Sequence, residues 1–339
     1  MTLLHSLSID RLHVPALLAA IFLATPVPGA RAAENAKIIE LGREVFNDQA
    51  LSADGKTSCG TCHDASHAYA DPRPRSIGVL GKTGTRNAPS LIGIADDDSF
   101  LWDGRRTRLE DVVLDPFTNP VELGLKSKSE ILGKLRLDPL VLSNFHAAFP
   151  NQNEVPTFEQ VRTALGSFIH SLASQKSALG SHTLSAEAKL GQHLFDSTAG
   201  CAECHSRRGA RPRYSDGQYH HSGIGPPPES LAKLSTEVVR ENLDADAIGP
   251  RVLSDPGWSS LGRFVVSHKP ADLGAFRTPS LRNVAATAPY MHDGSIATLT
   301  EAVDHEIYYR RFSNGHSIDL SVPERQALVE FLKTLTDTP

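Results

Sequence analysis

The chain has 339 residues, a length that fits two domains. Apolar residues make up 40% and charged residues 22%, an ordinary balance for a soluble globular protein, which excludes a disordered chain or a coiled coil. The formal net charge is −5, from 34 Lys and Arg against 39 Asp and Glu. No basic block stands out, so nucleic acid is not expected as the main partner.

Residues 1–32 have the pattern of a signal peptide. Residues 1–13 are polar and weakly basic, residues 14–25 form an apolar run, and small residues then lead to a cleavage site near Ala32. The apolar run is shorter than the roughly 20 residues that span a membrane, so no stable membrane anchor is expected. The sequence therefore predicts an exported protein, located in a bacterial periplasm.

Four cysteines form two C-x-x-C pairs, and each pair is followed at once by histidine. The motifs are Cys59-Gly-Thr-Cys62-His63 and Cys201-Ala-Glu-Cys204-His205. This spacing is typical of c-type haem attachment, in which two thiols bond one porphyrin and the adjacent histidine ligates its iron. A Cys₄ zinc site would not require a histidine after each pair, and a disulfide between cysteines three residues apart would be strained. We therefore expect two covalently bound haem c groups.

A short repeat precedes each motif. Residues 41–47 (LGREVFN) and 190–196 (LGQHLFD) share the pattern L-G-x-x-[VL]-F-[ND]. Each half of the mature chain is therefore predicted to be one cytochrome c-like domain with one haem. We expect the first domain over residues 33–182 and the second over residues 183–339, with the junction near residues 180–185.

The predicted elements are mostly helical, separated by long irregular loops. In chain order we expect helices over 33–46 and 157–179, a helix that Ser185 caps and that ends near Asp196, and helices starting near Thr298 and after Ser321. Glu301 and Glu324 complete capping boxes for the last two. Residues 64–99 and 206–230 are expected to be loop, and no stretch alternates as a strand does.

Further motifs follow a fixed order along the chain. They are LWDGR over 101–105, NPVE over 119–122, TPSLRNV over 278–284 and PYMHDG over 289–294, with the two haem motifs between and before them. This order resembles the bacterial dihaem cytochrome c peroxidase / MauG superfamily, over nearly the whole mature chain. The resemblance implies a mostly α-helical fold of two cytochrome c-like domains and a peroxide-using oxidoreductase.

The resemblance also implies roles for single residues. His63 is similar to the proximal ligand of a peroxide-binding haem, and His205 to that of an electron-transfer haem. Trp102 resembles the residue that relays electrons between the haems. Glu122 resembles the distal acid/base that assists cleavage of the O–O bond, a proton transfer that a carboxylate can perform.

Four more positions match the family pattern. Asn87, Thr287 and Pro289 match residues whose oxygen atoms hold a calcium ion between the domains, and His292 matches a residue near a haem propionate. Calcium is therefore an expected second cofactor.

The first haem departs from the peroxidase pattern at one position. In the peroxidases a histidine sixteen residues after the motif histidine caps the oxidised iron, and here that position is Val79. Valine cannot ligate iron, so the first haem is predicted to be five-coordinate and open to peroxide without prior reduction. His67 is the nearby substitute, and we expect it to be a surface residue.

The distal side of the second haem departs as well. Peroxidases have methionine there and MauG has tyrosine, but Met291 lies in the PYMHDG motif. Counting along the family pattern without gaps puts Glu306 at the position of the distal ligand. Tyr308 and Tyr309, however, resemble the tyrosine run of MauG-like proteins. We expect Tyr308 first and Tyr309 second, with Glu306 as a rival and His305 as a weaker alternative. Tyr308 requires the helix to end or bend there.

Three functions remain open from the sequence. The first is a MauG-like enzyme that uses hydrogen peroxide at the first haem and oxidises a partner protein, typically at tryptophan, through the second. The second is a peroxidase that reduces peroxide to water with electrons from a small redox protein. The third is a dihaem electron carrier, which Val79 and Glu122 disfavour.

Overall fold

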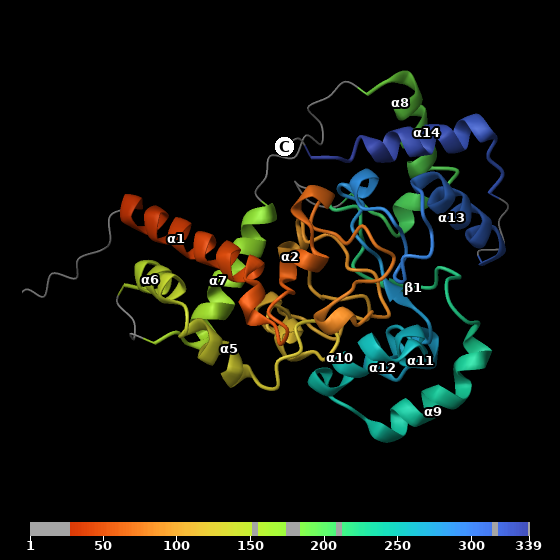
Figure 1. Ribbon diagram of the computed structural model, residues 1–339. Helices are drawn as coiled ribbons and strands as arrows, with labels where there is room; N and C mark the ends of the chain where they lie inside the picture. The colour runs from red at the N-terminus through yellow and green to blue at the C-terminus, as the bar shows by residue number, and fades with distance from the viewer. Residues whose placement is uncertain (1–27, 151–154, 174–183, 208–211, 314–317, 338–339) are drawn as a thin grey trace, which may run out of the picture.

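The computed structural model describes residues 28–150, 155–173, 184–207, 212–313 and 318–337. The predicted signal segment lies outside them up to residue 27, and most of the predicted junction near 180–185 does too. Helices dominate, as expected (Figure 1). Within the described ranges, no helix is both long and apolar enough to cross a membrane.

We call the described residues up to 173 the N-terminal half. Helices α1, α5, α6 and α7 gather at one side of the molecule, and α2 lies toward its centre (Figure 1). The α-helices are α1 (Pro28–Asn47), α2 (Cys59–Cys62), α3 (Leu109–Val112), α4 (Asp115–Thr118), α5 (Lys128–Leu135), α6 (Pro139–Ala148) and α7 (Phe158–Ala173). Short 3₁₀ helices are η1 (Gln49–Leu51), η2 (Ala65–His67), η3 (Val79–Gly81) and η4 (Ile94–Asp96).

The C-terminal half begins at residue 184. Helices α8, α13 and α14 lie together, and α9 to α12 form a separate group beside them (Figure 1). The α-helices are α8 (Ala186–Asp196), α9 (Ala232–Glu241), α10 (Ala245–Ser254), α11 (Pro256–Ser260), α12 (Phe264–Ser267), α13 (Leu299–Ser313) and α14 (Val322–Lys333). Its 3₁₀ helices are η5 (Cys201–Glu203), η6 (Pro228–Leu231), η7 (Pro270–Asp272) and η8 (Val284–Ala286).

The glycine of the sequence repeat lets two helices touch in each half. A Cβ at Gly42 on α1 would lie 2.0 Å from the Ala164 carbonyl oxygen of α7. A Cβ at Gly191 on α8 would lie 1.8 Å from the Ala327 carbonyl oxygen of α14. The backbones approach so closely that only glycine fits, which gives the repeated pattern its structural meaning.

The phenylalanine of the repeat builds the same aromatic cluster twice. In the N-terminal half the ring centroids of Phe46, Tyr69 and Phe168 lie 5.1–6.2 Å apart. In the C-terminal half those of Phe195, Tyr214 and Phe331 lie 5.2–6.3 Å apart. Edge-to-face and tilted rings at these spacings attract each other. Each cluster belongs to the hydrophobic core of its half and brings a tyrosine to the end of the haem-motif loop.

The local signals for helix ends are confirmed. The Ser185 hydroxyl accepts from the Ala188 N–H at the start of α8. Thr298 and Glu301 form a capping box before α13, and Ser321 and Glu324 form another before α14. The first predicted helix is longer at its start, because α1 begins at Pro28.

Two features were not expected from the sequence. Residues 219–220 (β1, Tyr219–His220) and 276–277 (β2, Phe276–Arg277) pair as two short antiparallel strands. In addition, α9 to α12 enclose a third hydrophobic cluster around Trp258, which is 1% exposed. The region between the second haem motif and β2 is therefore partly a packed helical unit.

Candidate functional site

The histidine of the first motif is held by a backbone carbonyl, as metal-ligating histidines usually are. The Nδ1 atom of His63 lies 3.0 Å from the carbonyl oxygen of Tyr69. Burial lowers the pKa of His63, so the imidazole is neutral and donates its Nδ1 proton to that carbonyl. A carbonyl partner on one ring nitrogen is the usual support of a histidine that ligates a metal through the other nitrogen.

The second motif repeats this arrangement. The Nδ1 atom of His205 lies 2.8 Å from the carbonyl oxygen of Tyr214, and burial also lowers the pKa of His205. Tyr69 and Tyr214 both adopt left-handed backbone, with φ of 56° and 55°. Two neutral imidazoles held in the same way, each beside a C-x-x-C pair, fit two haem groups.

The four cysteines are free thiols, which leaves them available for thioether bonds. Burial raises the pKa of Cys59 and of Cys201 to about 12, and that of Cys62 to about 11.

Glu122 lies close to the first C-x-x-C pair. Its charge adds to the rise in the pKa of both Cys59 and Cys62. Burial raises the pKa of Glu122 itself to about 7; the Arg105 guanidinium opposes this rise and Asp115 adds to it. A carboxyl group with this pKa is present in both protonation states near neutral pH, as a group that accepts and returns a proton must be.

Val79 is packed against the turn that carries Glu122. Its side chain is 1% exposed, and its N–H donates to the Glu122 carbonyl oxygen at 2.8 Å. A Cβ at Gly78 would lie 2.1 Å from the Val121 carbonyl oxygen, and one at Gly124 would lie 2.8 Å from a Val79 methyl carbon. The segment is therefore tightly packed, and its side chain at position 79 is a hydrocarbon.

His67 contacts the other half of the molecule. Its Nε2 atom lies 2.6 Å from the Ala288 carbonyl oxygen. This contact engages its imidazole at the junction of the halves, in a partly buried position rather than on the open surface that we expected.

Trp102 and His292 meet where the halves join. The Trp102 indole N–H donates to the Asn87 carbonyl oxygen at 2.9 Å, and the Asn87 N–H donates to the His292 carbonyl oxygen at 2.9 Å. The two rings are edge to face with centroids 6.4 Å apart. His292 also stacks on Phe276 at 3.6 Å, and burial together with Arg86 lowers the pKa of His292 to about 4.

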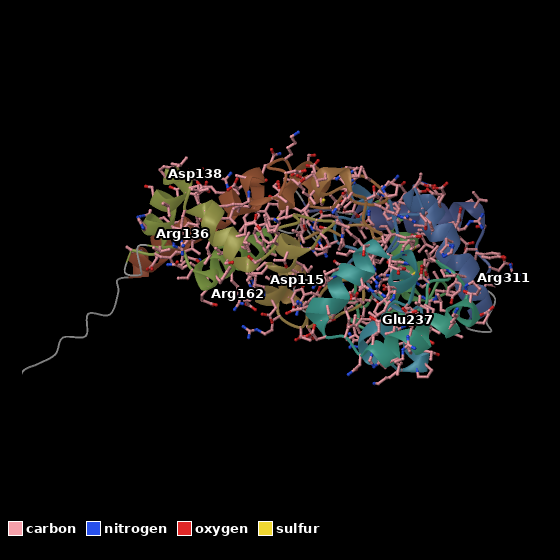
Figure 2. All side chains as sticks on the ribbon, turned by 60° about the horizontal axis from the view of Figure 1, so that its bottom comes forward. Asp115, Arg136, Asp138, Arg162, Glu237 and Arg311 are labelled. Carbon is pink, nitrogen blue, oxygen red and sulfur yellow. The ribbon has the colours of Figure 1, made fainter. Side chains whose placement is uncertain are left out.

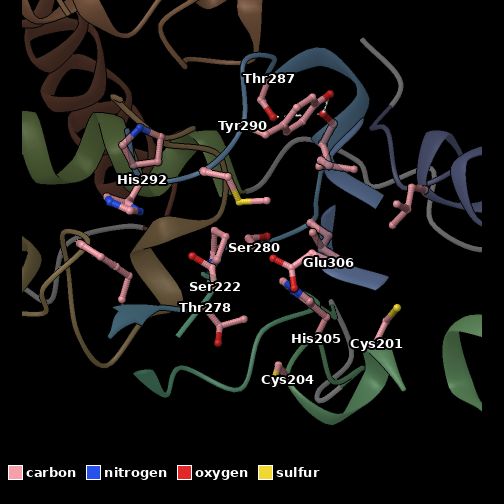
Figure 3. A pocket seen from close by; sticks show the side chains of 18 of the residues that line it. Cys201, Cys204, His205, Ser222, Thr278, Ser280, Thr287, Tyr290, His292 and Glu306 are labelled. Atoms are coloured by element: carbon pink, nitrogen blue, oxygen red, sulfur yellow. Dashed lines mark hydrogen bonds between the residues drawn. The ribbon is translucent and has the colours of Figure 1, made fainter. Parts of the chain in front are cut away.

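A cavity of about 620 Å³ lies beside the second motif, within the size range of cofactor sites (Figure 3). Its lining includes Cys201, Cys204 and His205 from the motif, and Trp102 and His292 from the junction. These side chains come from segments that are far apart in the sequence.

Glu306 and Tyr309 on α13 line this cavity, and Figure 3 shows Glu306 pointing into it near His205. Burial raises the pKa of Glu306, and its charge adds to the raised pKa of Cys201. Tyr309 stacks in parallel with His305, whose Nε2 lies 2.7 Å from the Ser222 carbonyl oxygen.

The structure does not support the preference for Tyr308. Its side chain is 65% exposed and lines a surface hollow with Asp304 and Arg325, away from the cavity. The reason is helical phase: α13 continues through position 308 to Ser313, so the end or bend that Tyr308 required is not present.

Asn87, Thr287 and Pro289 all border the cavity on the side of the junction. The Asn87 side-chain N–H donates to the Arg73 carbonyl oxygen at 3.1 Å.

Sequence reasoning missed the carbonyl groups of Tyr69 and Tyr214 that hold the two histidines. A backbone carbonyl has no signature of its own, although the recurrent aromatic residue after each motif was a usable signal.

Comparisons with known proteins agree with this geometry. The family model described as di-haem cytochrome c peroxidase matches residues 36–184. The cytochrome-c peroxidase IdrP2 of Denitromonas iodatirespirans is 31% identical, over 92% of this chain and 85% of that protein. The methylamine utilization protein MauG of Methylorubrum extorquens is 31% identical, over 89% of this chain and 78% of that protein.

Solved structures give the same result. A crystal structure of a MauG-like protein associated with microbial copper homeostasis matches with a TM-score of 0.71 and 30% identity, covering 89% of each chain. The dihaem peroxidase BthA of Burkholderia thailandensis shares the fold, with a TM-score of 0.65 at 20% identity over 92% of this chain and 87% of that chain. The chain therefore belongs to the dihaem cytochrome c peroxidase / MauG family and is an oxidoreductase of peroxidase type.

Proposed function

We propose that the protein reacts with hydrogen peroxide at a first haem held by Cys59, Cys62 and His63, and that the oxidising equivalents leave through a second haem held by Cys201, Cys204 and His205. The iron, when bound, supplies the redox chemistry. The single observation that carries the proposal is the packing of Val79 against Glu122, which offers the first haem a proton-transfer group and no ligand.

Glu122 moves the proton in this proposal. In its ionised form it accepts a proton from one peroxide oxygen, and in its protonated form it returns that proton to the leaving oxygen. A pKa of about 7 supports both steps near neutral pH, because neither form is scarce.

Trp102 connects the two sites. It borders the cavity of the second haem, and its ring and backbone are fixed by Asn87, by His292 and by the Arg277 N–H, which donates to the Trp102 carbonyl oxygen at 2.9 Å. We propose that it carries oxidising equivalents between the haems, and that His292 borders a propionate.

Glu306 is the distal ligand that we propose for the second haem, with Tyr309 as the alternative. Both side chains line the cavity, whereas Tyr308 does not. The proposal favours Glu306 because its carboxylate accepts no hydrogen bond from any described residue, whereas the Tyr309 ring is packed against Gly223 and His305.

Calcium is proposed at the junction, bound by oxygen atoms of Asn87, Thr287 and Pro289. These are the hard oxygen ligands that calcium prefers. Metal analysis of the purified holoprotein should find about one calcium per chain, and removal by a chelator should slow electron transfer between the haems. A calcium-free holoprotein with full activity would exclude the site.

The partner is proposed to be a protein that is oxidised at tryptophan, as in a MauG-like enzyme, and the chain is proposed to be exported to the periplasm. The sequence likeness to MauG proteins and to a solved MauG-like protein supports this reading. The second candidate function is a peroxidase that takes electrons from a small redox protein, which the likeness to named cytochrome-c peroxidases favours.

One experiment distinguishes a first haem that is open to peroxide from one that requires reductive activation. One equivalent of hydrogen peroxide is added to the fully oxidised holoprotein, without prior reduction, and followed by visible and EPR spectroscopy. Rapid loss of both ferric haem signals, slowed at the second haem by Trp102→Phe, would support the proposed function. No reaction until one haem is reduced would favour the peroxidase that requires reductive activation.

A further inference from the structure

Three arginines from the C-terminal half line the cavity proposed for the second haem, and two of them share one directly paired carboxylate. They are Arg213, Arg277 and Arg282, and their side chains are 13%, 8% and 2% exposed. Buried charges are costly unless they are paired. We therefore expect a further negative charge near these three side chains.

Two of the arginines share one carboxylate. The Nη1 atom of Arg277 donates to Asp97 Oδ2 at 2.9 Å, and Arg213 forms an ion pair with Asp97 Oδ1. Arg282 has its own partner, because its Nη2 atom donates to Asp337 Oδ2 at 2.6 Å. Arg213 and Arg277 thus share one directly paired carboxylate between them.

Hydrogen-bond donors are left over as well. Among the described residues, the Nε atoms of Arg213 and Arg282 are buried and have no hydrogen-bond partner. Burial, followed by the charge of Arg277, lowers the pKa of Arg213 to about 10; Asp96 opposes this and Arg282 adds to it. Burial and neighbouring positive charges destabilise the charged form of this guanidinium, and a further anion would stabilise it.

Arg213 is also fixed in place beside the proximal histidine. Its carbonyl oxygen accepts from the Leu281 N–H at 3.1 Å and from the Ser280 hydroxyl at 2.8 Å. The next residue is Tyr214, whose carbonyl holds His205. The backbone of Arg213 is therefore held next to the residue whose carbonyl holds His205.

We propose that Arg213 and Arg277, shared through Asp97, bind a propionate carboxylate of the second haem and raise its reduction potential. Each haem carries two propionates, and a planar guanidinium matches a carboxylate with two parallel hydrogen bonds. A fixed positive charge near the iron favours the reduced state, because reduction removes one positive charge from the haem. The inference rests on the proposed function only in that a second haem fills the cavity.

Asp97 gives the site a second property. It belongs to the N-terminal half, whereas both arginines belong to the C-terminal half. The carboxylate competes with the propionate for the same guanidinium groups. The potential of the second haem is therefore coupled to the packing of the two halves.

The test is a redox titration of the holoprotein without peroxide, with the two haems followed separately by visible and EPR spectra. Arg277→Gln and Arg213→Gln should each lower the equilibrium constant for one-electron reduction of the second haem about tenfold, which is a shift of about 59 mV. Asp97→Asn should shift it in the opposite direction, because it frees positive charge. Arg277→Lys keeps the charge and should lie between wild type and Arg277→Gln.

Arg311→Gln is the matched control. Arg311 is exposed at the outer edge of the C-terminal half (Figure 2) and lines the surface hollow beside Tyr308 instead of the cavity, so its substitution removes the same charge outside the cavity. It should leave both potentials unchanged.

Unchanged potentials in Arg213→Gln and Arg277→Gln, or equal shifts of both haems, would overturn the proposal. If Arg277→Gln does not fold, the proposal is still tested by Arg213→Gln and Asp97→Asn, which should shift the potential of the second haem in opposite directions. Since no peroxide is used, a protein inert to peroxide but with shifted potentials would refute the proposed function and leave this inference standing.

Discussion

The two halves hold the histidine of the haem motif in the same way and differ in the carboxyl group that lies near the motif. In each half a glycine lets two helices touch, an aromatic trio fixes a tyrosine, and the carbonyl of that tyrosine holds the motif histidine. The carboxyl groups proposed for the distal sides come from different elements: Glu122 lies in a turn packed against Val79, and Glu306 lies on helix α13. The comparison teaches that the support of the histidine is repeated, whereas the carboxyl group beside it is not.

The largest expected effect distinguishes the role of Glu122 from that of Glu306 in the reaction with peroxide. Glu122→Gln should slow the reaction of the oxidised holoprotein with peroxide by about 10²–10⁴-fold, the usual contribution of a positioned acid/base. Stopped-flow spectroscopy measures the rate constant. Glu306→Gln is the matched control and should leave this rate nearly unchanged. Equal rates in wild type and Glu122→Gln would remove Glu122 from the proton transfer.

The second prediction concerns the other distal side. Glu306→Gln should change the EPR and visible spectra of one haem, because an amide is a poorer iron ligand than a carboxylate. Tyr308→Phe should leave both spectra as they are, since that side chain is exposed. A spectrum altered by Tyr309→Phe and not by Glu306→Gln would transfer the ligand role to Tyr309.

The third prediction tests the shared scaffold. Gly42→Ala and Gly191→Ala should each lower the free energy of unfolding by about 1–3 kcal/mol, because the added methyl group meets a helix carbonyl. Denaturant titration measures the loss. Gly133→Ala on α5 is the control: a Cβ there meets nothing within 4 Å, so it should stabilise by about 0.5–1 kcal/mol. Unequal losses at the two glycines would show that the halves are not equivalent.

The smallest expected effect is the pH dependence of the first site. Glu122 must be ionised to accept the peroxide proton, and its pKa is raised to about 7. The rate constant should therefore rise with pH, by about tenfold between pH 6 and pH 8. In Glu122→Gln this rise of the rate constant with pH should be missing. A flat profile in the wild-type protein would indicate that another group takes the proton.

Much of the scaffold could be predicted from the sequence because its signals are local. A serine cap such as Ser185 acts within one turn, and the spacing of Cys59, Cys62 and His63 is a local pattern typical of haem attachment. The covalent haems, the domain boundaries and the roles of Glu122 and Trp102 stay predictions that the experiments above test.

The failures have a different origin. Tyr308 was preferred on a tyrosine run, but the phase of α13 turns that side chain to solvent. The cluster around Trp258 was not predicted, because its helices are short and its core forms only when α9 to α12 pack together. Shared carboxylates such as Asp97 depend on segments that are far apart in sequence, so no local pattern reveals them.

The raised pKa values of the thiols have a consequence for biogenesis. The thiolate is the reactive form of cysteine, and desolvation raises the pKa of Cys59 and of Cys201 to about 12, so thiolate is scarce in the closed chain. The proposed thioether bonds are therefore expected to form before the aromatic clusters close around each motif. Under the proposed function, attachment of each porphyrin would precede the folding of the half that holds it.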